Sequence, residues 1–216
     1  MRLFTLIMAL LLAGTAHAGA WLRAEGTGFL AYSTTFEEDG ALNGSFYGEY
    51  GVRPKLTLGL KADIDMTVGR AGNGSAFVFA RKPIQTRDRP FRLAYEVGIG
   101  STFGQSSDML LLTGLSYGRG IKIAGKHGWF ALDGSVEWSL GDGTDTGKLD
   151  TTVGLTLNDR FKVMVQVFHS LTDTASTTTL APSVIWQRKP DRPSYQIGLE
   201  AEEGAVALKL GIWQTF

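Results

Sequence analysis

The chain has 216 residues, with 21 basic and 21 acidic side chains, 28 glycines, 6 prolines and no cysteine. Its length suits a single domain, and the lack of cysteine excludes disulfides and thiolate metal sites. The balanced charge argues against nucleic acid as a partner, because a protein that binds a polyanion presents a basic surface.

Residues 1–18 have the order of a secretory signal peptide. One arginine precedes an apolar run over residues 3–13, and a small-residue Ala-His-Ala site ends at Ala18. The apolar run is shorter than the roughly 20 residues that a transmembrane helix needs. We therefore predict that residues 1–18 are a signal peptide and that residues 19–216 form the exported domain. A retained N-terminal anchor is the alternative.

The rest of the chain alternates apolar and polar residues with the period of two that is typical of β-strands. In "LTLGLKADIDMTV", which begins at Leu56, every second side chain is apolar, and Lys61, Asp63 and Asp65 lie between them. Short connections rich in Gly, Asn, Asp and Pro separate such segments. The sequence predicts twelve strands, near residues 22–36, 42–52, 56–68, 75–83, 91–103, 109–118, 129–140, 147–157, 160–171, 176–187, 194–203 and 205–216.

Three of these segments depart from simple alternation. The segments 75–83 and 109–118 do not show which of their faces is the apolar one. Pro182 lies inside the segment 176–187. Because proline cannot donate to the hydrogen-bond ladder, its position predicts a bulge there.

Alternation alone does not decide whether the apolar face points inward or outward. A soluble sandwich or a lipocalin-like barrel would turn it inward. Aromatic residues gather near the strand ends, as in the girdles of membrane barrels, and the chain is predicted to be exported. We therefore predict an all-β fold, a closed antiparallel transmembrane β-barrel of twelve strands, with ten or fourteen strands as alternatives.

The last segment, "ALKLGIWQTF", resembles the C-terminal strand of bacterial outer-membrane proteins, which ends in phenylalanine. Its even-numbered apolar residues share one face, namely Leu208, Leu210, Ile212 and Phe216. Gly211 lies at the position that this strand prefers for glycine, whereas Gln214 departs from the pattern. The resemblance implies that Gly211 and Phe216 belong to a signal read by the barrel-assembly machinery.

A second segment, "EYGVRPKLTLGL", resembles the strand–turn–strand units of small porin-like and transporter-like outer-membrane barrels. This resemblance implies an integral protein of the outer membrane of a Gram-negative bacterium, surrounded by outer-membrane lipids. With the N-terminus on the periplasmic side, the odd connections lie outside the cell. The outer connections, such as "EEDGALNG" and "GDGTDTG", are mostly acidic, and the periplasmic ones, such as "RPK" and "RKPDRP", are mostly basic.

Two motifs that could carry chemistry are weak. "GIKIAGKH", over residues 120–127, nearly matches a phosphate-binding loop, but His127 replaces the Ser or Thr and a strand follows instead of a helix. His169 would face lipid, and the outer-membrane phospholipase A family places a serine–histidine–asparagine site on its lipid-facing wall. No motif of that family occurs here, and one histidine without partners specifies no mechanism. We predict that the protein is not an enzyme and has no catalytic residues.

The polar face of the strands predicts the lining of the lumen. The predicted lining residues are Lys61, Asp63, Asp65, Arg92, Glu96, Asp133, Glu137, Lys148, Asp150, Lys162, Gln166, Glu200, Glu202, Lys209 and Trp213. Paired carboxylates such as Asp63 and Asp65 suggest a metal site, but no calcium-binding loop is present. We expect lysines and arginines to neutralise them across the lumen, and we predict no metal and no cofactor.

The strand number predicts the width of the barrel. Twelve strands lie between the eight that side chains fill and the sixteen that leave an open channel. We therefore predict a narrow passive pore for small polar or charged solutes. A closed structural or interaction barrel without conductance is the first alternative, and an outer-membrane lipid hydrolase that uses His169 is the second.

Overall fold

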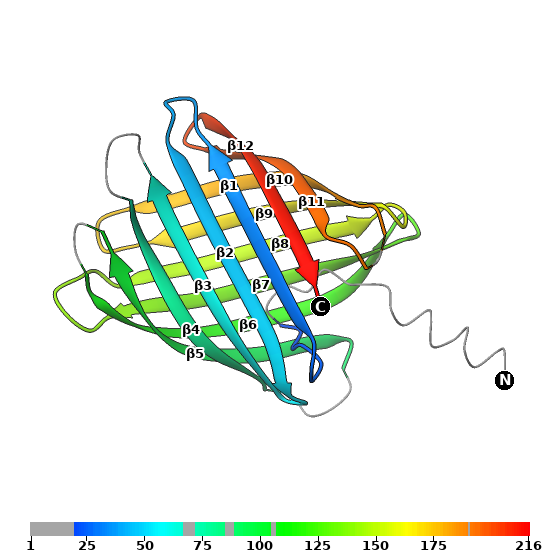
Figure 1. Cartoon of the computed structure of the whole chain (residues 1–216), viewed down its shortest axis with the longest axis horizontal. Helices are drawn as coiled ribbons and strands as arrows, with labels where there is room; N and C mark the ends of the chain where they lie inside the picture. The colour runs from blue at the N-terminus through cyan, green and yellow to red at the C-terminus, as the bar shows by residue number, and fades with distance from the viewer. Residues whose placement is uncertain (1–19, 67–71, 85–88, 105–106, 190) are drawn as a thin grey trace.

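Twelve strands form one closed antiparallel sheet in which each strand pairs with its neighbours in sequence and β12 pairs with β1 (Figure 1). This confirms the predicted fold. The computed structural model describes residues 20–66, 72–84, 89–104, 107–189 and 191–216, so the predicted signal peptide lies outside it. The strands are β1 (Gly28–Phe36), β2 (Leu42–Arg53), β3 (Leu56–Met66), β4 (Asn73–Pro83), β5 (Phe91–Phe103), β6 (Met109–Ile123), β7 (Lys126–Ser139), β8 (Thr146–Thr156), β9 (Phe161–Leu171), β10 (Ser176–Gln187), β11 (Ser194–Glu202) and β12 (Ala205–Thr215).

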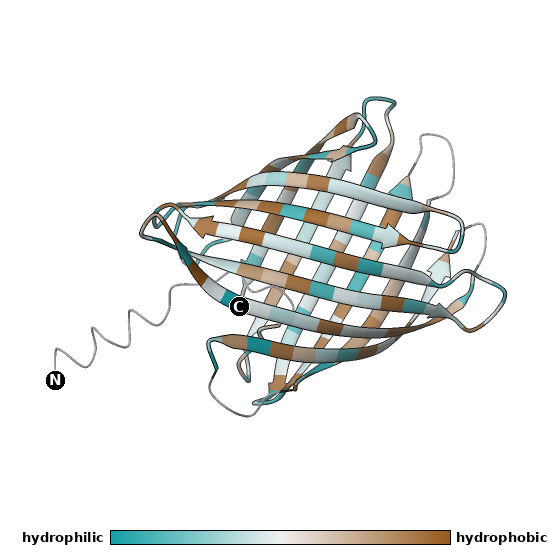
Figure 2. Cartoon of the chain, turned by 180° about the vertical axis from the view of Figure 1, so that it is seen from behind, coloured by the Kyte–Doolittle hydropathy of each residue, from teal (hydrophilic) through white to brown (hydrophobic). Residues whose placement is uncertain are grey.

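The outer wall of the barrel is apolar. Figure 2 shows hydrophobic and hydrophilic residues alternating along the strands, as the period of two requires. The hydrophobic members point outward, and Val78, Ile99 and Leu115 are 54%, 56% and 62% exposed. Exposing such a wall to water would cost about 25 cal/mol for each Å², so the wall suits a hydrocarbon environment. Within the described residues no helix is long and apolar enough to cross a membrane.

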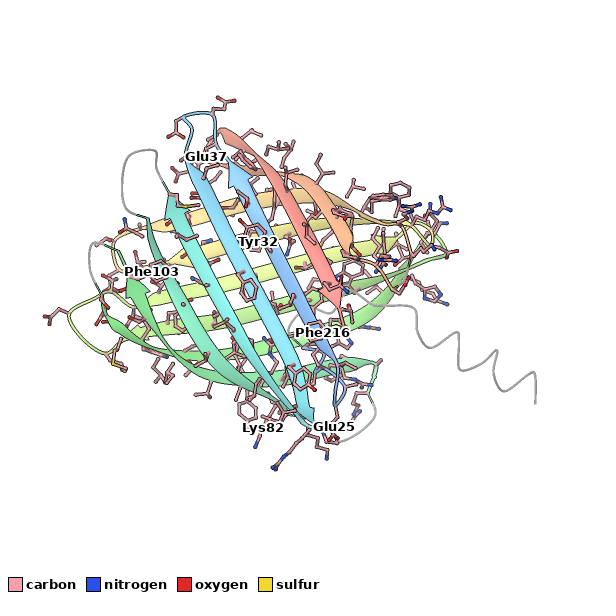
Figure 3. The ribbon with its side chains drawn as sticks, viewed as in Figure 1. Glu25, Tyr32, Glu37, Lys82, Phe103 and Phe216 are labelled. Atoms are coloured by element: carbon pink, nitrogen blue, oxygen red, sulfur yellow. The ribbon has the colours of Figure 1, made fainter. Side chains whose placement is uncertain are left out.

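We call the end of the barrel where β1 begins and β12 ends the proximal end, and the opposite end the distal end. Figure 3 shows Lys82 at the proximal end and Glu37 at the distal end. The ladder of β1 and β12 closes the barrel, and two further backbone hydrogen bonds extend this seam at the proximal end. The Gly28 amide donates to the Phe216 carbonyl at 2.6 Å, and the Phe216 amide donates to the Gly28 carbonyl at 3.0 Å.

The first strand begins later than the sequence predicts. We expected it to start near residue 22, but β1 begins at Gly28. Residues 20–27, which we call the N-terminal segment, turn back toward the lumen instead of extending the sheet. Two contacts fix this turn, because the Gly26 amide donates to the Gly51 carbonyl at 2.9 Å and the Thr27 amide donates to the Ala24 carbonyl at 3.0 Å.

The hairpin of β6 and β7 is longer than expected. We predicted that these strands end at residue 118 and begin at residue 129, but they extend to Ile123 and from Lys126. Only Ala124 and Gly125 form the turn, with φ angles of 49° and 77°, as a two-residue hairpin requires. The predicted phosphate-loop mimic is therefore a β-hairpin, because its isoleucines continue the alternation on the outer wall.

The predicted bulge at Pro182 is wrong. Pro182 pairs with Val165 of β9 in a register that continues on both sides. The ladder toward β11 keeps the same register before and after the proline. The irregularity occurs elsewhere, between Gly51 and Arg53 in the pairing of β2 with β3.

An apolar cluster from β4 and β6 fills one side of the lumen. Phe77, Phe79 and Leu112 are at most 4% exposed, although they lie on the inward face. The strand between them, β5, presents glycines there, and a Cβ on Gly98 would overlap Phe79. The sequence of these segments was ambiguous because both of their faces are apolar.

The Phe79 ring also lies directly on Gly59 of β3, so a Cβ at that position would overlap the ring. We expect Gly59→Ala to lower the free energy of unfolding by about 1–3 kcal/mol, because the packed cluster prevents the ring from moving aside. Gly120→Ala is the matched control, since a Cβ on Gly120 has no heavy atom within 4 Å. Urea unfolding of the refolded barrel in lipid vesicles measures both variants, and equal midpoints would contradict the expectation.

Candidate functional site

Two adjoining cavities occupy the lumen. The distal chamber has a volume of about 440 Å³ and the middle chamber about 320 Å³. Tyr47, Lys61, Asp150 and Lys209 line both of them, so the two chambers adjoin each other. The distal chamber reaches the distal rim at Asp65, whose side chain is exposed to solvent. Together the two chambers extend from the distal end to the middle of the barrel.

Most of the residues that the sequence assigns to the lumen line these chambers. They are Lys61, Asp63, Asp65, Glu96, Asp133, Glu137, Lys148, Asp150, Gln166, Glu200, Lys209 and Trp213. The other three lie near the ends of the barrel. Arg92 is exposed at the proximal end and donates to the Arg89 carbonyl at 2.8 Å, and Lys162 stands at the proximal start of β9. Glu202 ends β11 distally, where the Thr179 hydroxyl donates to it.

A buried ion-pair network joins β2, β4 and β5 on the lumen side. The Arg81 guanidinium lies between two carboxylates, with Nη2 2.5 Å from Glu96 Oε2 and Nη1 in contact with Glu49 Oε1. The Tyr47 hydroxyl donates to the same Glu49 oxygen. Glu49, Arg81 and Glu96 are each less than a tenth exposed. Because every charge has an opposite partner, the network fixes these side chains, whereas a lone buried charge would be strongly destabilising.

Lysines hold further carboxylates on the lumen wall. Lys148 Nζ lies 2.8 Å from Glu137 Oε1, and Lys61 Nζ lies 4.0 Å from the same oxygen. On the opposite wall, Lys209 Nζ lies 2.6 Å from Glu200 Oε1. These pairs join β3, β7 and β8 on one side and β11 and β12 on the other. Each lysine of the distal chamber therefore already has a carboxylate neighbour.

Three carboxylates of the distal chamber remain without such a neighbour. Asp63, Asp65 and Asp150 form no ion pair with another residue that the structure describes. Asp150 stands directly opposite Asp133 in the ladder of β7 and β8, and Asp133 Oδ1 is buried without a hydrogen-bond partner. In the described part of the chain, no cluster of acidic or histidine side chains has the arrangement of a metal site. The distal chamber therefore carries an excess of negative charge.

The N-terminal segment occupies the proximal end of the lumen. Ala20 is 1% exposed, and Trp21 packs against an apolar cluster of inward-facing residues from four strands. That cluster contains Trp129 of β7, Met164 of β9, Ile185 of β10 and Trp213 of β12. A Cβ on Gly118 of β6 would overlap both Ala20 and the Trp21 ring.

Arg23 attaches the same segment to the opposite wall. Its backbone amide donates to Thr57 Oγ1 of β3 at 3.0 Å, and its Nε lies 2.7 Å from Glu49 Oε2 of β2. The guanidinium also lies 4.4 Å from the centre of the Phe29 ring. The segment thus contacts β2 and β3 on one side and the cluster from β7, β9, β10 and β12 on the other. It therefore crosses the proximal end of the lumen.

Several of these residues are absent from the predicted lining. Glu49 and Arg81 alternate with outward-facing neighbours, and that alternation is the signal that could have found them. Arg81 was missed because its strand is apolar on both faces. The predicted strand 22–36 includes Arg23 in the sheet, whereas β1 begins only at Gly28 and Arg23 lies in the lumen.

His169 points away from the lumen, as its place in the alternation predicts. Its Nδ1 lies 2.9 Å from the hydroxyl of Thr178, the residue directly opposite in the ladder of β9 and β10. The neighbouring Ser170 points inward and lines the distal chamber. No other described residue makes a hydrogen bond or ion pair with the imidazole. The pair therefore contains a base and a hydroxyl but lacks the third group that orients a catalytic histidine.

No protein-family model and no curated protein sequence matches the chain. Solved structures do match. The KdgM porin is similar with a TM-score of 0.64 and 8% identity, over 87% of this chain and 99% of the porin. The COG4313 outer membrane channel from Pseudomonas putida F1 is similar with a TM-score of 0.56 and 12% identity, over 93% of this chain and 100% of the channel. LpxR from Salmonella typhimurium is similar with a TM-score of 0.58 and 10% identity, over 87% of this chain and 99% of LpxR. The chain therefore has the fold of small bacterial outer-membrane β-barrels and resembles porin-like proteins.

Proposed function

We propose that the protein is a narrow outer-membrane channel for small polar or charged solutes, closed at its proximal end by the N-terminal segment. The two adjoining, charge-lined chambers are the observation that carries this proposal, since a purely structural barrel needs no solvent-filled path. The KdgM porin and the COG4313 channel have the same fold, which supports a channel without naming a solute. Solutes pass once the segment leaves the lumen.

The same proposal orients the barrel in the membrane. The apolar outer wall contacts outer-membrane lipids, the proximal end faces the periplasm, and the acidic connections at the distal end face the outside. Gly211 and Phe216 serve as the assembly signal in this proposal. Phe216 fits this role because it follows β12 directly at the seam, where its backbone pairs with Gly28 and its ring is exposed.

Conductance across a planar lipid bilayer tests the proposed channel. We expect discrete current steps that are brief and infrequent, because the lumen conducts only while the N-terminal segment is displaced. Heat-denatured protein at the same concentration is the control. If a correctly folded preparation gives no steps, even in the variants that free the segment, the proposal is wrong and the barrel is a closed structural or interaction protein.

Lipid hydrolysis is not part of this proposal. A hydroxyl nucleophile needs a base whose other ring nitrogen is held by a third group. The imidazole of His169 contacts Thr178, and none of the described residues holds its Nε2. The chambers provide the better supported function, because they bring many charged side chains together along one path.

A further inference from the structure

A depression of about 690 Å³ lies on the outer wall of the barrel, apart from the lumen. It crosses β5 to β9 in the distal half. Its outward-facing lining residues are Tyr95, Val97, Thr113, Leu115, Gly134, Val136, Gly147, Leu149, His169 and Leu171. We call this depression the outer groove. Its volume lies within the range of about 300–1,000 Å³ that is typical of small-molecule sites.

Two glycines create the outer groove. In the ladders, Leu115 stands opposite Gly134 and Gly134 stands opposite Leu149, so the wall has no side chain between two leucines. In the next row toward the distal end, Gly147 leaves a second gap beside Leu171. A Cβ on Gly134 would be 3.7 Å from its nearest neighbour, so space and not a close contact surrounds this glycine. The rest of the outer wall around the gaps carries large apolar side chains.

One side of the outer groove is polar. His169 follows Leu149 in the same row, and its hydrogen-bond partner Thr178 comes next. A polar side chain on a wall that faces hydrocarbon is unfavourable unless it has a partner, and such residues mark functional positions. The imidazole keeps a second ring nitrogen that no described residue contacts. The site is therefore amphipathic, apolar along the groove and polar at its β9–β10 side.

This combination selects one kind of occupant. An apolar groove that ends at an imidazole and a hydroxyl matches an amphiphile whose chain is apolar and whose head carries ester or phosphate oxygens. We propose that the outer groove binds one acyl chain of a membrane lipid and that His169 hydrogen-bonds an oxygen of the same lipid near its head. Lipopolysaccharide and glycerophospholipids share this chemistry. The inference does not depend on the proposed channel, because the groove lies on the other side of the wall.

Native mass spectrometry of the full barrel measures the bound lipid directly. The protein is refolded into vesicles of palmitoyl-oleoyl phosphatidylglycerol, with or without lipopolysaccharide, and then released into detergent. We expect one retained lipid per barrel. Gly134→Leu should reduce its retention about tenfold by filling the outer groove, and His169→Ala should do so by removing a hydrogen bond to a polar head.

A matched control tests whether lipid loss comes from filling the outer groove or from any larger side chain on the outer wall. Val184→Leu also enlarges an outward apolar side chain, on β10 outside the outer groove, and should leave the retained lipid unchanged. Unshifted migration of the unheated barrel on a denaturing gel shows that each variant is folded. Retention of only one of the two lipid classes assigns the source and supports the site. Equal retention in all variants overturns it, and so does a barrel dimer that Gly134→Leu abolishes, since a second copy would then be the occupant.

Discussion

The Arg23→Ala variant should conduct far more often than the wild-type barrel. The Arg23 side chain holds the N-terminal segment to Glu49, and a hydrogen bond to a charged group contributes about 1.5–3 kcal/mol. Glu49 keeps Arg81 as a second partner, so the loss falls mainly on the docking of the segment. A change of about 2 kcal/mol shifts an equilibrium between docked and released segment by roughly thirtyfold. The open fraction of time in single-channel records measures this shift.

Arg53→Ala is the control for the lost charge. Arg53 lies at the same end of the barrel, but its side chain is exposed and belongs to no ion pair among the described residues. We expect its records to resemble those of the wild type. Trp21→Ala should act in the same direction as Arg23→Ala, because Trp21 packs on the opposite wall. If Arg23→Ala and Arg53→Ala give the same open fraction, the segment is not the closing element.

The barrel itself follows from local sequence features. Alternation with a period of two fixes which side chains share a face, and β3 shows it without exception. Connections rich in glycine, asparagine and aspartate mark the ends of the strands. These signals act over two to about ten residues, so one sequence suffices to predict the strands and the closed sheet. The predicted strands of the β6–β7 hairpin are too short because a two-residue turn contains too few residues to show a glycine-, asparagine- and aspartate-rich connection.

The position of the N-terminal segment in the lumen depends on contacts that no local pattern contains. Arg23 is buried because Glu49 and Thr57 meet it from two strands that follow later in the chain. As a sequence, the N-terminal segment looks like the start of a strand, and only the packing of Trp21 in the lumen shows otherwise. The unpaired state of Asp63 and Asp150 likewise depends on which lysines the registers of distant strands bring near. The sequence therefore predicts which kinds of side chain line the lumen. It does not predict which of them form ion pairs, or that the N-terminal segment occupies the lumen.

The second large effect concerns the charge of the permeating ion. In the distal chamber, Glu137 and Glu200 are paired with lysines, while Asp63, Asp65 and Asp150 are not. An unpaired carboxylate about 4 Å from a passing ion changes its energy by about 1 kcal/mol even in water, and by more in a narrow lumen. We expect the open channel to prefer cations. Under a potassium chloride gradient across the bilayer, the reversal potential should shift toward the equilibrium potential of potassium.

Replacing the three unpaired aspartates with asparagine should remove that preference. The triple variant Asp63→Asn, Asp65→Asn and Asp150→Asn leaves three lysines against two carboxylates in the distal chamber. The reversal potential should therefore move to zero or toward the equilibrium potential of chloride. The effect should be largest at about 0.1 M salt or below, because screening acts over about 10 Å at that ionic strength.

A control variant tests whether the selectivity depends on carboxylates in the lumen or only on the net charge of the protein. Asp159→Asn also removes a carboxylate, in the turn between β8 and β9 at the proximal end, where it lines neither chamber. It should leave the reversal potential unchanged. Measuring both variants in the Arg23→Ala background gives enough open time for a precise potential. A triple variant that keeps the cation preference would show that the ions pass elsewhere, or that the paired glutamates determine the selectivity. In either case the unpaired aspartates would have no part in the selectivity of the channel.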